Sequence, residues 1–73
     1  MDFEDIQQTL AEQIRSERSR AGLSQEQLAL TAEVDRTYVS QLERGIANPS
    51  LQILYRIASA LNSDLVVKFK DRR

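Results

Sequence analysis

The sequence contains no cysteine and no histidine, and these absences exclude several kinds of site. Without cysteine there is no disulfide framework and no thiolate metal ligand. Without either residue an ordinary zinc site and a histidine-based catalytic triad are excluded. The chain has only two glycines and no glycine-rich phosphate loop, and its carboxylates show no obvious acid–base partner. We therefore expect no cofactor, no metal and no enzymatic activity.

Long apolar runs are missing as well. No stretch approaches the roughly 18 apolar residues of a membrane span, and no basic start followed by an apolar stretch marks a signal peptide. A cytoplasmic protein without membrane contact is expected. The 73 residues, 41% of them hydrophobic, fit a single domain over 1–73. A domain this short buries only about 60% of the surface that its unfolded chain exposes, and dimerisation can supply further burial.

The net charge of −1 conceals an uneven distribution of charges. Residues 1–35 carry three arginines against eight acidic residues, a balance of −5, whereas residues 36–73 carry seven basic residues against three acidic ones, a balance of +4. Such a chain can direct its basic part toward a nucleic acid and its acidic part away. The alternative is an ordinary solvated surface with accidental clustering.

The scarce glycine and proline residues divide the chain into helical segments. Gly22, Gly45 and Pro49 mark the breaks. Apolar residues recur at helical spacing between them, for example Ile6, Leu10, Ile14 and Ala21 in the first segment and Leu51, Leu54, Ile57, Ala58 and Leu61 in the last. The pattern predicts four helices, over about 3–21, 24–33, 36–44 and 50–61.

Polar residues at the predicted helix starts support these boundaries. Ser24 and Gln27 have the spacing of a capping box, in which each side chain satisfies a free backbone donor of the helix start. Asp35 is a suitable N-cap for the third helix. Gly22 can take the left-handed conformation that ends the first helix.

The last segment differs in composition from the rest. Residues 65–70 read LVVKFK, and β-branched and aromatic residues with partial alternation favour a short strand. A lone strand needs a partner, so we expect this segment to pair with its equivalent in a second subunit. The alternative is a frayed tail over residues 64–73.

Residues 25–44 have the properties of a helix-turn-helix unit, two short helices joined by a tight turn. The helices cross closely, so one contact residue must be small, and Ala29 is suitable. Large apolar residues must seal the crossing, and they are present as Leu28, Val34, Val39 and Leu42. The exposed face of the second helix must carry polar side chains that reach base edges, and those available are Arg36, Thr37, Ser40, Gln41 and Arg44.

The stretch LSQEQLALTAEVDRTYVSQLERGIANPSLQILYRIASALN resembles the Cro/lambda-repressor-like family, often called XRE. The resemblance runs from about Arg15 to Asn62 and includes the L-S-Q opening, the Y-V-S-Q-L-E-R-G run and the N-P-S-L start of the last helix. The run DRTYVSQLERG is most similar to the controller proteins of restriction–modification systems. The strand-like tail is instead similar to small antitoxin repressors of toxin–antitoxin pairs.

The resemblance implies an all-α domain of four or five helices, with the C-terminal strand as an addition, that binds double-stranded operator DNA as a two-fold homodimer. It implies that base contacts come from Arg36, Thr37, Ser40 and Gln41. It implies that contacts to the DNA backbone come from Gln25, Tyr38, Arg44 and Asn48. It also implies a structural ion pair between Arg18 and Glu43.

One residue departs from the family pattern. The turn between the two motif helices usually carries glycine, because φ is often positive there, and this chain has Glu33. We expect Glu33 either to adopt the left-handed conformation at a cost of about 1 kcal/mol or to alter the turn.

The sequence therefore predicts a transcriptional regulator that binds a pseudo-palindromic operator through the major groove. Two alternatives remain. The first is a DNA-binding antitoxin that also binds a toxin protein. The second is a protein-interaction module that has kept the fold and lost DNA binding, and the net negative charge is its main support.

Overall fold

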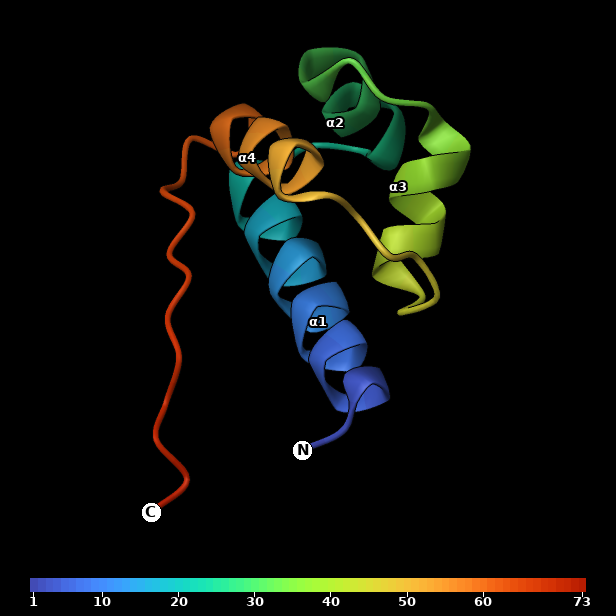
Figure 1. The fold of residues 1–73 in the computed structure, drawn as a ribbon. Helices are drawn as coiled ribbons and strands as arrows, with labels where there is room; N and C mark the ends of the chain where they lie inside the picture. Colours follow the sequence, from blue (N-terminus) through green and yellow to red (C-terminus); the bar gives the residue numbers. More distant parts are fainter.

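The computed structural model describes residues 1–73 and consists of four helices joined by short connections (Figure 1). The predicted all-α fold is confirmed. No helix is both long and apolar enough to cross a membrane. The helices are α1 (Phe3–Ala21), α2 (Gln25–Ala32), α3 (Arg36–Glu43) and α4 (Leu51–Ala60).

Local side-chain chemistry determines where the first two helices begin and end. The predicted capping box of α2 is present, with Ser24 and Gln27 each accepting a backbone N–H of the other. A second box, between Asp2 and Asp5, starts α1. Gly22 ends α1 in the left-handed conformation, with φ of 72°. These boundaries follow from residues adjacent in sequence.

The starts of α3 and α4 differ in their caps. Ser50 accepts a hydrogen bond from the Ile53 backbone N–H at 3.1 Å and so caps α4. Asp35 has the extended conformation of an N-cap residue, but its side chain accepts no hydrogen bond from α3. The predicted position of this N-cap is confirmed, and the cap has no side-chain hydrogen bond.

The core lies where α1, α2, α3 and α4 meet. Leu28, Val39 and Ile57 are the largest fully buried side chains. Three residues of the apolar stripes identified in the sequence are not buried: Ile6 is 50% exposed, Leu51 is 64% exposed and Ala21 is exposed. The apolar stripes of α1 and α4 are therefore wider than the surface that a single chain can cover.

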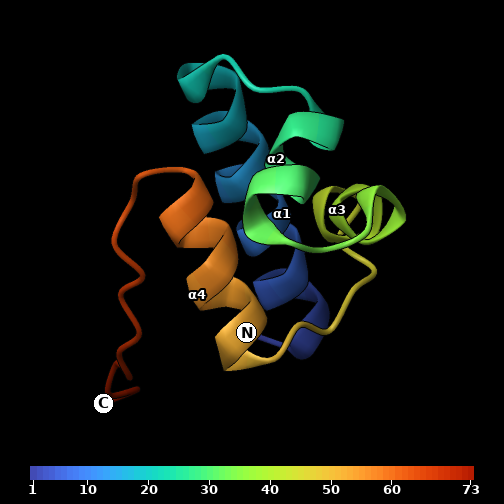
Figure 2. The same cartoon turned by 90° about the horizontal axis from the view of Figure 1, so that it is seen from above.

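The chain after α4 carries no helix and no strand. Residues 63–73 leave the end of α4 and run along the side of the molecule opposite α3, as two views show (Figures 1 and 2). The strand expected over 65–70 is not formed within this chain, because the chain has no second strand to complete a ladder. Pairing with a second copy stays a prediction.

Candidate nucleic-acid interface

Helix α3 lies at the edge of the molecule, with one face on the core and the other directed outward (Figure 2). Val39 and Leu42, three residues apart, are buried. The opposite face is polar. Seven residues of this region are predicted to contact DNA. Five are exposed, namely Arg36, Thr37, Gln41, Arg44 and Asn48. The other two, Tyr38 and Ser40, are half-buried.

The outward face of α3 carries no exposed carboxylate, although the chain as a whole is acidic. Arg36 begins the helix and Arg44 follows its last residue. The only acidic residue within α3 is Glu43, and it is buried. The exposed carboxylates nearest in sequence, Glu33 and Asp35, belong to the preceding turn. The net charge of −1 therefore says little about the charge that α3 presents.

Glu43 is held by Arg18 of α1, in the ion pair that the family resemblance implies. Arg18 Nε and Glu43 Oε2 lie 2.6 Å apart, and Arg18 Nη2 and Glu43 Oε1 lie 2.9 Å apart. The Glu43 side chain is only 3% exposed. Its side-chain hydrogen bond raises the pKa of the Arg18 guanidinium above its ordinary value. The pair joins α1 to the end of α3, with its carboxylate buried and its guanidinium 22% exposed.

Gln25, expected to contact a phosphate, also joins this cluster. Its side-chain Nε2 donates to Glu43 Oε1 at 3.2 Å, and the residue is half-buried at the first turn of α2. An amide nitrogen carries two N–H donors. Glu43 uses one of them, which leaves the second without a partner among the hydrogen bonds of this chain.

Three residues of α1 that sequence reasoning missed also hold the end of α3. Arg15 donates to the Glu43 carbonyl, Gln8 to the Arg44 carbonyl at 3.5 Å, and Gln7 to the Ala47 carbonyl at 2.8 Å. Gln8 and Arg15 are seven residues apart and so share a face of α1. Nothing in the sequence indicates which distant carbonyls they reach.

The residue after Arg44 is Gly45, and it lies close to Gln8 of α1. Gly45 is buried and has φ of +75°. A Cβ there would meet the end of the Gln8 side chain. The left-handed backbone conformation is therefore what favours glycine here, because the exposed end of the Gln8 side chain can move aside.

The turn between α2 and α3 retains left-handed geometry in spite of its residue. Glu33 has φ of 60° and ψ of 46° and forms the C-terminal cap of α2. The first of the two expected outcomes for Glu33 is the one observed. The turn thus has the backbone shape for which glycine is usual, with an L-residue in it.

Comparison with known proteins agrees with this geometry. The Helix-turn-helix family model HTH_3 matches residues 14–67. Control protein C.SmaI of Serratia marcescens is 44% identical over 63 residues, which cover 86% of this chain and 75% of that protein. Control protein C.BamHI of Bacillus amyloliquefaciens is 44% identical over 43 residues, 59% of this chain and 53% of that protein.

A solved structure is similar over most of the chain. The restriction-modification controller protein C.AhdI of Aeromonas hydrophila superposes with a TM-score of 0.83 at 36% identity, over 88% of this chain and 93% of that one. The fold and the outward polar helix define a helix-turn-helix DNA-binding transcriptional regulator rather than an enzyme. The chain belongs to the XRE-type helix-turn-helix family, HTH_3, and controller proteins are among its relatives.

Proposed function

We propose that this protein is a cytoplasmic regulator that binds a pseudo-palindromic operator as a homodimer, with α3 of each subunit in the major groove. The observation that carries the proposal is the outward face of α3, where exposed Arg36, Thr37 and Gln41 lie on a helix whose only carboxylate is buried. In a two-fold dimer the two α3 helices enter successive grooves about 34 Å apart.

The base contacts follow from the chemistry of the exposed side chains. Arg36 can donate two hydrogen bonds to guanine O6 and N7, and Gln41 can pair with adenine N6 and N7. Thr37 offers a methyl group to thymine or a hydroxyl to a phosphate. Ser40 is half-buried, so we assign it a secondary contact.

The backbone contacts surround this helix. The second N–H of Gln25 would donate to a phosphate at the start of α2, where the helix dipole favours an anion. Arg44 and Asn48 are exposed after the end of α3, and Tyr38 is half-buried beside it. These contacts would fix the orientation of α3 without reading sequence.

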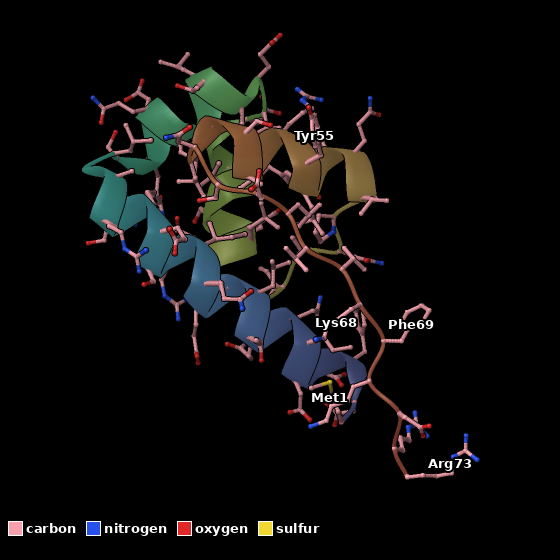
Figure 3. All side chains as sticks on the ribbon, turned by 90° about the vertical axis from the view of Figure 1, so that its left-hand side faces the viewer. Met1, Tyr55, Lys68, Phe69 and Arg73 are labelled. Carbon is pink, nitrogen blue, oxygen red and sulfur yellow. The ribbon has the colours of Figure 1, made fainter.

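The second subunit would bind to the surface formed by α4 and the tail. Leu51, Tyr55 and Val67 line an open groove there and are 64%, 64% and 65% exposed. Figure 3 shows Tyr55 on the outer side of α4, on the side of the molecule along which the tail runs. This surface lies opposite α3, so a second copy would leave both reading helices free to meet DNA.

Charge complementarity also favours a second copy as the occupant. Lys68 and Lys70 stand exposed on the tail, beside Met1 and Ile6 at the start of α1, where Asp2, Glu4 and Asp5 are exposed (Figure 3). A surface with both signs of charge and a central apolar groove can be complementary to itself under a two-fold axis.

Replacing Tyr55 by aspartate is expected to raise the dimer dissociation constant at least tenfold, because it places a carboxylate in the apolar groove. Sedimentation velocity at micromolar concentration measures it. The control is Leu30→Asp on α2, which is 72% exposed and outside the groove and should remain dimeric.

Deletion of residues 65–73 tests the role of the tail in the same assay. If the tail pairs with its equivalent in the second subunit, the truncated chain should sediment as a monomer. A truncated chain that remains dimeric at micromolar concentration would show that strand pairing between subunits is wrong, while leaving α4 as the dimer contact.

Binding to random duplex DNA should be strongly dependent on salt. A protein with six to ten phosphate contacts loses about 10³–10⁵-fold in affinity between 50 and 200 mM salt, since each contact releases condensed counterions. Fluorescence anisotropy over a salt series gives the slope. A protein-interaction module that had lost DNA binding would show no binding at any salt concentration.

The similar proteins indicate which genes this regulator controls. Two of them are named control proteins, and one similar solved structure is a restriction-modification controller protein. We propose that this chain regulates genes of a restriction–modification system. The antitoxin alternative has less support, because it depended on a strand that the single chain does not form.

A further inference from the structure

An arginine of α4 reaches the turn of the helix-turn-helix unit. Arg56 Nε donates to the Ala32 carbonyl at 3.0 Å, and its Nη2 donates to the Glu33 carbonyl. Ala32 is the last residue of α2, and Glu33 is the left-handed residue after it. These two bonds join α4 to the connection from which α3 departs.

Arg56 donates to carbonyl groups at the end of α2 that have no backbone hydrogen-bond donor. The Glu33 N–H donates to the Leu30 carbonyl at 3.3 Å and the Val34 N–H to the Ala29 carbonyl at 3.0 Å. This pair of bonds is a Schellman motif, in which glycine normally occupies the left-handed position. The motif leaves the Ala32 and Glu33 carbonyls without backbone donors, and Arg56 supplies both with one rigid planar group.

The conformation that Arg56 holds carries a cost. An L-residue in the left-handed region is less stable than glycine there, because its Cβ approaches the carbonyl oxygen. Glu33 would therefore leave this conformation more readily than glycine if nothing held it. Only Val34 and Asp35 separate it from the start of α3, so a change of φ at Glu33 would reorient Arg36.

We propose that Arg56 is a positioning residue for DNA recognition: it holds Glu33 in the left-handed conformation and thereby fixes α3 relative to α2. It acts from α4 through two backbone carbonyls, rather than from the outward face of α3. Its own position is secured by the next residue, Ile57, which is 2% exposed in the core. The effect of Arg56 on DNA recognition rests on the proposed function, whereas its stabilisation of the turn at Glu33 does not.

The hold on the turn can be measured without DNA. Arg56→Ala should lower the hydrogen-exchange protection of the Val34 amide about tenfold in the natural chain. In a Glu33→Gly background the same substitution should lower it less than threefold, since glycine keeps the turn without help. An equal loss in both backgrounds, or no loss in either, would overturn the proposal.

Binding of the full-length chain to its selected operator tests the recognition role, at a temperature where circular dichroism shows the variant folded. Arg56→Ala should lower operator affinity about tenfold and affinity for random DNA less than threefold, and Glu33→Gly should restore most of the difference. The control is Arg20→Ala, which removes the same charge from an arginine side chain that is 73% exposed and should leave the ratio unchanged. Equal losses on both DNAs would make Arg56 a charge contact and contradict the proposal.

A second variant keeps the test valid if Arg56→Ala does not fold. Arg56→Lys retains the charge but has no planar fork for two carbonyls, so it should show an intermediate fall in both protection and operator affinity. Full retention of both by lysine would show that charge alone suffices, against the proposal. If the natural chain binds no DNA, the proposed function fails, and the exchange data still decide whether Arg56 holds the turn.

Discussion

Arg18→Ala is expected to lower the free energy of unfolding by about 3 kcal/mol, the lower end of the range for breaking a buried ion pair, because the Arg18 side chain is 22% exposed. The carboxylate of Glu43 is 3% exposed and would lose both guanidinium hydrogen bonds, 2.6 and 2.9 Å long. Gln25 would remain as its only side-chain donor. Urea denaturation followed by circular dichroism measures the change as a shift of the midpoint.

The chain offers a matched control for this loss. Arg20 pairs with Glu17 on the same helix at 3.3 Å, but its side chain is 73% exposed. Removal of such a surface pair changes stability by less than about 1 kcal/mol. If Arg18→Ala were no more destabilising than Arg20→Ala, the view of Arg18 and Glu43 as the brace between α1 and α3 would be wrong.

Arg36→Ala is expected to weaken operator binding by about 1–3 kcal/mol, roughly fivefold to 150-fold, and to relax specificity at one base pair. The reason is that a bidentate arginine–guanine contact supplies discrimination of this size. Titrations against the operator and against an operator with that base pair exchanged measure both effects. The variant should fold normally, because the Arg36 side chain is exposed and makes no hydrogen bond within the chain.

Arg44→Ala is the comparison that distinguishes a base contact from a contact to the DNA backbone. Arg44 is exposed beyond the last residue of α3 and is assigned to the DNA backbone. Its loss should weaken binding to operator and random DNA alike and reduce the salt slope by about one. If Arg36→Ala behaved in the same way as Arg44→Ala, Arg36 would be a phosphate contact and its assignment to a base would be contradicted.

Features determined by neighbouring residues could be predicted from the sequence. The Ser24–Gln27 capping box, the left-handed Gly22 and the boundaries of the four helices depend on side chains within a few positions of each other. The sequence left two outcomes open for Glu33, and the structure has the left-handed one, with φ of 60°.

Features that depend on contacts between distant segments could not be predicted. Arg15 and Arg56 read as ordinary surface charges in the sequence, yet each donates to a carbonyl more than 20 residues away. Leu51 fits the apolar stripe of its helix, but in one chain nothing covers it. Helical periodicity predicts which face of its helix a residue occupies. It does not predict which segment packs against that face, because tertiary packing decides this.

The most direct test of the central claim, that α3 of a dimer reads an operator, is selection of bound duplexes from a random DNA pool by the full-length chain. We expect enrichment of a pseudo-palindrome whose half-sites are centred about one helical turn apart. Each half-site should contain a guanine whose replacement lowers the affinity of the natural chain but not that of the Arg36→Ala variant. A bound pool with no enriched sequence, or with a single unrepeated half-site, would contradict the account.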